Sequence, residues 1–563
     1  MQIFSKYIVT ILIIANISIN AKSKDPVRGH NGMVVSASDI ASLVGIDILE
    51  KGGNAVDAAV ATGFALAVTY PQAGNLGGGG FMVIHLEDGT NTTIDYREKA
   101  PQSAFRDMFL DKNGKFDLTK STEGWVSSGV PGSVAGMLYA LEKYGTMTRD
   151  EVIQPAIKLA YNGFLVDYRF AETLNNYKNE FAKYKSTAKI FTKKDEKFSE
   201  GELFIQKDLA KTLKAIKLKG TEGFYKGEVA NLIAKHSKLK GGLIAKEDLA
   251  KYNAVERAPV IGNYRNNTIV SMGPPSSGGI ALLEALNSLE YFSFEMNSWG
   301  NSNYIHTVSE VLKYVYADRA EHLGDIDFYP VPQNWLISKE RGKEIAALVN
   351  EKAIPSKKIS HAISPQKESE ETTHYSVVDS YGNAVSVTTT LNSTFGNKIV
   401  VNGAGFIMNN EMDDFSSKPG VPNQFGLLGG EANSIEPNKR MLSAMTPTIV
   451  LNSDNKPHIV IGSPGGSTII TTVLQVILNV IDFNMNIQEA IDAPRFHHQW
   501  KPDQIDYERF GLTEDVKKNL IKRGQNIGRQ RILGRAEGII IDYDNNVIWG
   551  ASDPRGYGEA VGY

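Results

Sequence analysis

The chain has 563 residues, a formal net charge of −3 and an ordinary balance of apolar (42%) and charged (22%) residues. This balance is typical of a globular protein and gives no sign of a nucleic-acid or anionic-membrane partner. The absence of cysteine excludes disulfides, thiol catalysis and cysteine-ligated metals, which leaves Ser, Thr, Lys or a carboxylate as candidate nucleophiles.

The first 21 residues have the pattern of a secretory signal peptide. Lys6 precedes the apolar run YIVTILIIA (7–15), and the small residue Ala21 ends the segment before polar KSKDP. A membrane anchor is the alternative, but the run is well short of the roughly 20 apolar residues of a spanning helix. We therefore expect residues 1–21 to be removed and the mature chain to be soluble, and periplasmic or secreted.

Two successive helices are expected after this segment, in SASDIASLVGIDILEKGGNAVDAAVATGFALAVTYP. Asp39 is the expected cap of the first, which the glycine pair after Lys51 ends. Asn54 is the expected cap of the second, and Pro71 terminates it. The glycine run NLGGGG (75–80) then leads into a strand.

The region from about 120 to 260 alternates helical patterns with polar loops. Its Lys-rich part, 178–198, is predicted to be a solvated helical face. PPSSGG (274–279) marks a turn before another helix. The segment 350–371 combines prolines, serines and charges with little periodicity, which indicates an exposed loop or linker.

Strands are expected in the last third of the chain. THYSVVDSYGNAVSVTT has two β-rich runs around 380–383, the pattern of a hairpin. TPTIVLN and PHIVIG should form further strands, and SPGGS should turn the second into the apolar helix TIITTVLQVILNVI.

Common nucleotide, serine-hydrolase and metal motifs are missing. GGGG (77–80) lacks the Lys-Ser/Thr of a phosphate loop, and there is no G-x-S-x-G or HExxH. His497 and His498 are adjacent, where helix or strand geometry would point them apart. The sequence predicts neither a cofactor nor a metal.

Thr372 follows a charged segment (KESEE, 367–371) and begins a predicted strand. A threonine hydroxyl needs a neighbouring base, and an N-terminal α-amine, with a pKa near 7.7–8, can serve. Thr372 holds such an amine only if the chain is cut just before it. The local pattern equally fits a surface loop leading into a strand, where threonine is common.

Motifs along nearly the whole mature chain resemble those of the γ-glutamyltranspeptidases (glutathione hydrolases), in the superfamily of N-terminal-nucleophile hydrolases. They are NLGGGGFM, DYREKAP, PPSSGG, YADRAEHLGD, TTHYSVVD, GNAVSVTTTLN, NNEMDDFS, PNKR, GSPGGS, APRFHHQW and GASDPR.

The resemblance implies an α+β fold, the four-layer αββα sandwich of the N-terminal-nucleophile hydrolases. The precursor is expected to cut itself between Glu371 and Thr372. The large chain (22–371) and the small chain (372–563) would form an intertwined heterodimer. The implied reaction moves the γ-glutamyl group of glutathione and related small molecules to water or to an amino acid or peptide, without cofactor, metal or nucleic acid.

The resemblance also assigns catalytic residues. Thr372 corresponds to the nucleophile and Thr390 to the threonine whose hydroxyl bonds it. Gly465 and Gly466 correspond to the residues whose N–H groups hold the oxyanion, where a side chain would obstruct close approach.

The glutamyl head carries an α-carboxylate and an α-ammonium, so its site needs walls of both charges. Arg97 and Ser443 match the family positions that bind the carboxylate. Asn392, Glu411 and Asp414 match those that receive the ammonium. A guanidinium suits the first task because it pairs bidentately with a carboxylate.

Three residues depart from the family pattern. Ala444 replaces a second serine after Ser443, Phe425 stands where many bacterial members have a tyrosine over the pocket, and Thr468 stands where relatives often carry arginine.

Two alternatives remain open. One is a related acylase acting on β-lactam side chains or poly-γ-glutamate, against whose β-lactam version Arg97 and Asp414 argue. The other is an unprocessed solute-binding protein, against which Thr372, Thr390 and GSPGGS argue.

Overall fold

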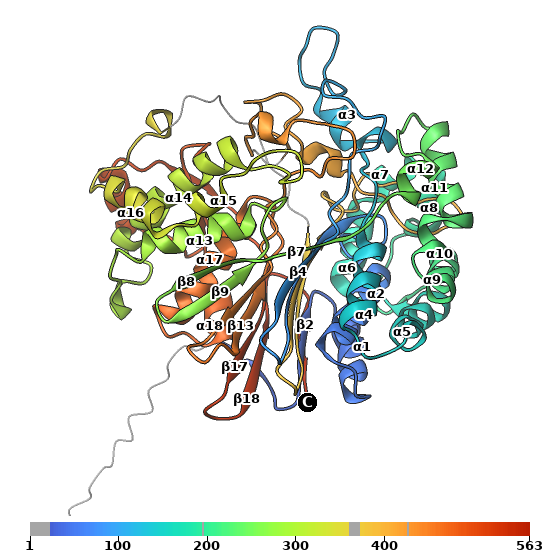
Figure 1. The fold of residues 1–563 in the computed structure, drawn as a ribbon, viewed down its shortest axis with the longest axis horizontal. Helices are drawn as coiled ribbons and strands as arrows, with labels where there is room; N and C mark the ends of the chain where they lie inside the picture. The colour runs from blue at the N-terminus through green and yellow to red at the C-terminus, as the bar shows by residue number, and fades with distance from the viewer. Residues whose placement is uncertain (1–22, 194–195, 360–371, 425–426) are drawn as a thin grey trace, which may run out of the picture.

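Two seven-stranded antiparallel sheets lie face to face at the centre of the molecule, and helices cover both outer surfaces (Figure 1). The computed structural model describes residues 23–193, 196–359, 372–424 and 427–563. Its layers are helix, sheet, sheet and helix, so the predicted αββα sandwich is confirmed.

Each sheet mixes strands from distant parts of the sequence. In sheet order, the first consists of β1 (Val27–Gly29), β18 (Val547–Ser552), β17 (Glu537–Asp542), β13 (Pro457–Gly462), β12 (Thr448–Leu451), β9 (Asn267–Ser271) and β8 (Val260–Tyr264). The second consists of β19 (Glu559–Gly562), β2 (Met33–Ser36), β10 (Thr373–Val378), β11 (Ala384–Thr390), β3 (Gly79–His85), β4 (Asn91–Asp95) and β7 (Val255–Arg257). Small sheets join β14 (Phe496–His497), β15 (Ile505–Tyr507) and β16 (Ile527–Gln530), and β5 (Phe164–Leu165) with β6 (Leu203–Phe204).

The helices form two groups, one on each side of the sheets (Figure 1). Beside the second sheet lie α1 (Asp39–Glu50), α2 (Ala55–Thr69), α4 (Ser133–Tyr144), α5 (Arg149–Asn162), α6 (Tyr168–Asn176), α7 (Lys178–Ala182), α8 (Lys185–Phe191), α9 (Lys207–Lys219), α10 (Glu222–Tyr225), α11 (Gly227–Leu239) and α12 (Lys246–Ala250). Beside the first lie α13 (Gly278–Leu289), α14 (Ser302–His322), α15 (Gln333–Leu336), α16 (Lys339–Leu348), α17 (Thr468–Ile481), α18 (Ile487–Asp492) and α19 (Glu514–Lys522). Short helical turns are α3 (Leu118–Thr122), η1 (Trp125–Ser127), η2 (Met296–Ser298), η3 (Ser356–Lys358), η4 (Glu411–Asp414) and η5 (Glu431–Asn433).

Apolar burial on both faces of each sheet holds the layers together. Between the sheets, Phe81 and Val83 of β3 belong to one buried cluster with Val270 of β9 and Val460 of β13. Further clusters pack the helices onto the outer faces. A strand that is buried on both faces has a nearly continuous run of apolar residues. The run PHIVIG predicts such a strand, and it forms β13.

One of the two predicted N-terminal helix caps is confirmed and the other is wrong. The prediction that Asp39 caps α1 is wrong by one residue, because the Ser38 hydroxyl accepts the N–H of Ala41 and Asp39 is already helical. Asp39 still places a negative charge in the first turn, where the helix dipole favours it. The predicted cap of α2 is confirmed: Asn54 accepts the N–H of Asp57, whose carboxylate accepts the N–H of Asn54 in return.

The predicted hairpin after Thr372 is confirmed as β10 and β11, with Thr373 opposite Thr389. This pair occupies the middle of the second sheet, between β2 and β3. The second sheet therefore contains strands from both sides of the 371–372 bond in mixed order, and so does the first.

Across the described residues, no helix has the length and apolar character needed to cross a membrane.

Candidate active site

Thr372 lies immediately before β10, at the end of the central hairpin. Its hydroxyl donates to the Thr390 hydroxyl, with 3.4 Å between the two oxygens, and its side chain is buried. The β10–β11 register explains the contact, because Thr373 pairs with Thr389 and the next positions outward are Thr372 and Thr390. The structure thus brings together the two threonines that the sequence analysis singled out.

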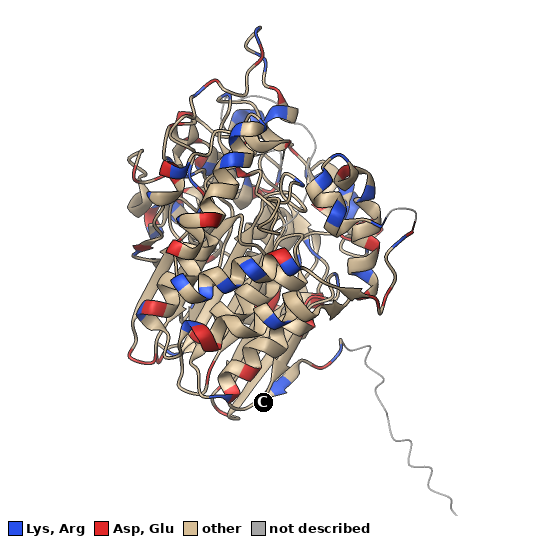
Figure 2. Cartoon of the chain, turned by 90° about the vertical axis from the view of Figure 1, so that its right-hand side faces the viewer, with Lys and Arg blue, Asp and Glu red and all other residues tan. Residues whose placement is uncertain are grey.

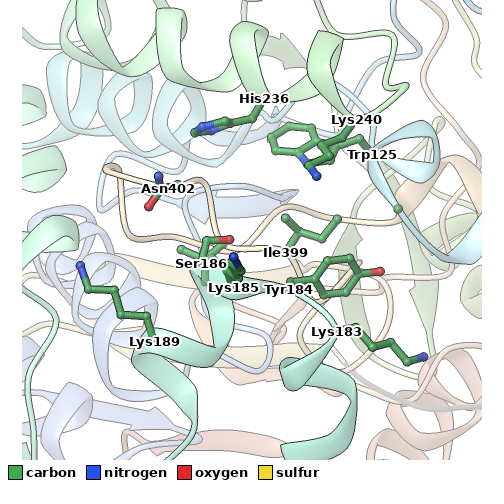
Figure 3. A pocket seen from close by; sticks show the side chains of 12 residues that line it. Trp125, Lys183, Tyr184, Lys185, Ser186, Lys189, His236, Lys240, Ile399 and Asn402 are labelled. Atoms are coloured by element: carbon green, nitrogen blue, oxygen red, sulfur yellow. The ribbon is translucent and has the colours of Figure 1, made fainter.

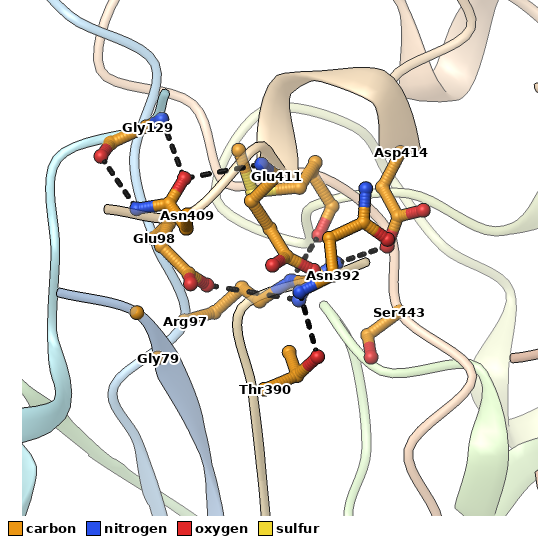
Figure 4. Close-up of polar contacts among 12 residues, drawn as sticks. Gly79, Arg97, Glu98, Gly129, Thr390, Asn392, Asn409, Glu411, Asp414 and Ser443 are labelled. Carbon is orange, nitrogen blue, oxygen red and sulfur yellow. Dashed lines mark hydrogen bonds and ion pairs between the residues drawn. The ribbon is translucent and has the colours of Figure 1, made fainter. Parts of the chain in front are cut away.

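The Thr390 hydroxyl is fixed by the backbone that follows it. It accepts the N–H of Asn392 at 2.8 Å, and Asn392 adopts a positive φ of 77°, a conformation that asparagine tolerates better than most residues. The Asn392 side chain donates to the carbonyl of Asn410 at 2.9 Å. Asn392 therefore connects the threonine pair to the acidic turn η4 (Figure 4).

The glycine run before β3 allows the chain to pass close to Thr390. A Cβ on Gly78 would come within 2.0 Å of the Thr390 carbonyl oxygen, and one on Gly79 within 2.4 Å of the Glu98 carboxylate. Both contacts are far shorter than van der Waals distances. The glycines are thus needed for close packing of the chain beside the site, and the run does not have the signature of a phosphate loop.

Arg97 lies fully buried among carboxylates (Figure 4). Its guanidinium pairs with Glu411 and Asp414, lies 3.6 Å from Glu98 and donates through Nε to the Met441 carbonyl at 3.2 Å. The sequence analysis placed Arg97 and the two acids on opposite walls. In this structure they contact each other directly, so an incoming carboxylate must compete for the guanidinium.

The charges in this cluster do not balance, since three carboxyl groups face the guanidinium of Arg97, and the one further arginine of the described chain that acts on them, Arg319, interacts with Asp414. Burial raises the pKa of Glu411, and of Asp414, while Arg97 counteracts it. Burial also raises the pKa of Glu98, again against the effect of Arg97. One oxygen of Glu411 and both of Glu98 are buried without a hydrogen-bond partner among the described residues. The cluster consequently has spare acceptors and would gain from an added ammonium group.

Ser443 is held by the PPSSGG turn, whose role the sequence analysis did not foresee. The Ser443 N–H donates to the carbonyl of Pro275, and its own carbonyl accepts from the N–H and hydroxyl of Ser277. The Ser443 hydroxyl accepts the N–H of Met445 at 3.1 Å. The turn before α13 therefore sets the position of a predicted substrate-binding side chain.

The two glycines of SPGGS both have backbone conformations that favour glycine, with φ of 133° at Gly465 and 54° at Gly466. Neither N–H donates a hydrogen bond to a residue that the structure describes. The Gly465 carbonyl accepts both the N–H and the hydroxyl of Thr468, at 2.9 and 2.8 Å. Thr468 thus ties the glycine pair to the beginning of α17.

One small cavity, of about 20 Å³, gathers these groups. Its lining includes every predicted catalytic and binding side chain. Of the two oxyanion glycines, Gly466 lines the cavity and Gly465 does not. Leu427 and Ile469 form its apolar walls. This volume suits about one water molecule. A glutamyl group would therefore have to displace part of the lining. Ala444 lines the cavity, while Glu371 and Phe425 lie outside the described residues.

Asp413, next to the cluster, is buried between two donors. The Ser121 hydroxyl donates to one of its oxygens at 2.6 Å and the Gln424 N–H to the other at 3.1 Å. Burial raises the pKa of Asp413 to about 7, more than these hydrogen bonds lower it.

Asp413→Asn should therefore change the pH dependence of stability. Because the folded pKa exceeds the unfolded one, the stabilisation from the protonated group is complete below pH 4 and is lost as pH rises to 7. Asparagine stays neutral and can still accept from Gln424 and donate to Ser121. We expect the variant's free energy of unfolding to exceed that of the wild type by a margin that grows from pH 4 to 7 and then levels off. Denaturant titrations across this range measure the margin; a constant difference would contradict the assignment, and the exposed Asp544→Asn is the control.

Two charged residues near the site were missed by the sequence analysis. Glu98 directly follows Arg97 in DYREKAP, and Arg319 lies in the YADRAEHLGD motif. Arg319 is buried, donates to Ser277 at 2.9 Å and interacts electrostatically with Asp414; burial lowers its pKa to about 10. Their presence inside quoted motifs was the available signal, but nothing local predicted burial.

His497 and His498 are structural. His497 bonds Thr471 at 2.8 Å and Gln499 at 2.7 Å, and His498 accepts the N–H of Trp500 at 3.0 Å. Within the described part of the chain, no group of three or more His, Asp or Glu side chains is arranged to hold a metal ion.

An αββα sandwich with a threonine at the head of a central strand is the architecture of the N-terminal-nucleophile hydrolases. The cephalosporin acylase of Bacillus halodurans superposes with a TM-score of 0.86 at 26% identity, over 98% of this chain and 99% of the other. The γ-glutamyltranspeptidase of Helicobacter pylori superposes with a TM-score of 0.57 at 48% identity, over 61% of this chain and 96% of the other.

Sequence comparison narrows this class to one family. The model of the γ-glutamyltranspeptidase family matches residues 41–563, and the chain belongs to that family. It is 51% identical to the glutathione hydrolase proenzyme of Escherichia coli K12, over 94% of this chain and 91% of the relative. It is 46% identical to the glutathione hydrolase proenzyme of Pseudomonas sp. A14 over the full length of both. The acylase ACY 1 proenzyme of Pseudomonas sp. V22 is 35% identical over 94% and 93%.

Proposed function

We propose that this chain is a self-processing γ-glutamyltransferase and hydrolase that uses Thr372 as its nucleophile. One observation carries the proposal above the others: the Thr372 hydroxyl lies against Thr390 in the same cavity as Arg97, Glu411 and Asp414. Glutathione and related γ-glutamyl amides are the proposed substrates, in keeping with the proenzyme names of the E. coli and Pseudomonas relatives.

In the proposed reaction the Thr372 oxygen attacks the γ-carbonyl of the substrate, and the α-amine released by processing takes the hydroxyl proton. The carbonyl oxygen becomes an anion that the N–H groups of Gly465 and Gly466 stabilise. Their lack of partners among the described residues supports this role. The substrate's γ-amide bond then breaks, its amine product leaves with a proton supplied by the Thr372 α-ammonium, and a γ-glutamyl ester remains on Thr372. Water or an acceptor amine then attacks the ester and frees the threonine.

The same oxygen is proposed to act first on the chain itself. Attack on the Glu371 carbonyl would shift the acyl group from nitrogen to oxygen, and water would then hydrolyse the ester. The products would be 22–371 and 372–563. Interleaving of strands from both parts in each sheet supports their remaining together as one composite domain.

The last described turn of the proposed large chain, η3, also contacts the small one. The Ser356 N–H donates to Asp503 at 2.8 Å, and its carbonyl accepts from the Trp500 indole at 2.9 Å. We further propose that residues 1–21 are removed during export; these residues lie outside the described chain.

Thr468→Val should lower kcat by about tenfold with little change in KM, because it removes the hydroxyl that bonds Gly465 and loosens the proposed oxyanion donors. Thr472→Val, on the same helix, removes a longer bond to Leu533 and should have little effect. Steady-state kinetics with a chromogenic γ-glutamyl anilide separate the two parameters. An unchanged kcat in Thr468→Val would remove this residue from the catalytic account.

The second candidate function is that of an acylase whose substrates carry acyl groups without an α-ammonium. It is supported by the similarity to the cephalosporin acylase structure and to the ACY 1 relative. The surplus of carboxyl groups around Arg97 argues against it, because the buried oxygens of Glu98 and Glu411 that lack hydrogen-bond partners among the described residues would stay without them. The decisive comparison uses γ-glutamyl and glutaryl anilides, which differ only in the amino group. We expect kcat/KM to favour the γ-glutamyl compound by at least about a hundredfold. Equal values would favour the acylase.

A further inference from the structure

A second, larger cavity of about 830 Å³ lies away from the candidate active site, between α8, the end of α11, the turn η1 that begins at Trp125 and the loop that carries Ile399 (Figure 3). It shares no lining residue with the cavity around Thr372. Its volume falls in the range of small-molecule sites. Neither the sequence motifs nor the proposed reaction use it.

Four lysines line this cavity: Lys183, Lys185, Lys189 and Lys240. All four are exposed, and none forms an ion pair with a described residue; the first three lie in the region 178–198 that was predicted to be a solvated face. Lys185 and Lys189 are one turn apart on α8 and so share a face. Figure 2 views the molecule from the side on which α8 and α11 lie in Figure 1, where Lys and Arg and also Asp and Glu appear on the helices.

The walls between the lysines are aromatic and apolar. These walls are formed by Trp125, Tyr184, Ile399 and Val400. Apart from the lysines, the polar side chains on the lining are Ser186, Asn402 and His236. The His236 Nδ1 atom is buried and has no hydrogen-bond partner among the described residues. A ligand could therefore place a ring against the indole and phenol while its charges reach the lysines.

The cavity is held open by hydrogen bonds in its walls. The Thr187 hydroxyl donates to the Lys398 carbonyl at 2.8 Å and accepts the N–H of Val400 at 3.0 Å, which joins α8 to the loop opposite. Asn397 donates to the Gly124 carbonyl at 3.2 Å, next to Trp125. A preformed site of this kind loses little entropy when a ligand binds.

Acidic residues are absent from the lining, although two lie close by. Glu123 adjoins Gly124, and together with burial, the larger cause, it raises the pKa of Tyr184. Burial lowers the pKa of Lys398, one residue before the lining loop, and Glu123 and Glu180 counteract it. Four lysines on the lining against these two nearby carboxylates leave the cavity positive.

We propose that this cavity is a second binding site, which takes a planar aromatic compound carrying two or more negative charges. Aromatic rings match the Trp125 and Tyr184 walls, and multiple charges match the lysines. Nucleoside and flavin phosphates and aromatic disulfonates share this chemistry. The binding does not depend on γ-glutamyl transfer.

Calorimetric titration of the purified protein tests the proposal with three probes: AMP, FMN and naphthalene-1,5-disulfonate. At least one should bind saturably at one site with Kd below about 1 mM. Adenosine has the ring of AMP without its phosphate, and inorganic phosphate has the charge without the ring. Each should bind at least about tenfold more weakly than the best probe. The exposed double variant Lys185→Glu with Lys189→Glu should weaken that probe by at least about tenfold.

A matched control separates this site from general charge. Lys214→Glu, on the exposed face of α9, should keep the wild-type Kd. Absence of binding by all three probes would overturn the proposal. So would inorganic phosphate binding as tightly as the ring compounds, or an unchanged Kd in the double lysine variant.

Discussion

Thr372→Ala should accumulate as one uncut chain and show no measurable γ-glutamyl turnover. Alanine lacks the oxygen that is proposed to attack first the Glu371 carbonyl and then the substrate. The structure gives the variant little reason to misfold, since the lost contact is a single 3.4 Å hydroxyl pair with Thr390. A denaturing gel and a γ-glutamyl anilide assay on the same preparation measure both losses.

Two conservative variants sharpen this prediction. Thr372→Ser keeps a hydroxyl and should be cut and active, at a lower rate. Thr373→Val changes the adjacent threonine, whose buried hydroxyl has no hydrogen-bond partner among the described residues, and should behave as wild type. If Thr372→Ala were cut or turned over substrate, or if Thr373→Val failed in the same way, Thr372 would not be the nucleophile.

Arg97→Ala should lower kcat/KM for γ-glutamyl substrates by at least about a hundredfold, while cleavage of the precursor continues. The substitution removes the guanidinium that is proposed to bind the substrate carboxylate, and breaking such a buried pair costs about 3–5 kcal/mol. It also leaves Glu98, Glu411 and Asp414 without their cation, so thermal stability should fall. Kinetics, a gel and a melting curve separate the three effects.

The controls for Arg97 distinguish charge from geometry. Arg97→Lys keeps a positive charge but loses the forked pairing with two carboxylates, and it should recover more stability than activity. Arg106→Ala removes an exposed arginine that pairs with Glu431 and should change neither. Wild-type kcat/KM in Arg97→Ala would remove Arg97 from the substrate site.

Local sequence patterns were sufficient for the central hairpin and its surroundings. Alternation on either side of 380–383 predicts β10 and β11, and an antiparallel hairpin brings Thr372 next to Thr390. Asn54 before a helical run predicts the start of α2. The same rule missed Ser38 because Asp39 is also a common cap, and only the backbone conformation distinguishes them.

Long-range contacts could not be read from the sequence. Arg97 and Glu411 are 314 residues apart, and their direct pairing depends on how the second sheet and η4 meet. The same holds for the support of Ser443 by the PPSSGG turn, and for the cavity between α8 and α11. The Lys-rich region was correctly predicted to be exposed, but its exposure alone did not indicate that three of its lysines line a cavity.

Identification of the chain termini in the purified wild-type protein tests the central claim most directly. Intact-mass analysis and N-terminal sequencing should find two chains, the smaller beginning TTHYS and ending at residue 563, so that Thr372 carries a free amine. A single chain that continues through Glu371 and Thr372 in fully active protein, or a separation of the large and small chains at any other bond, would contradict the account.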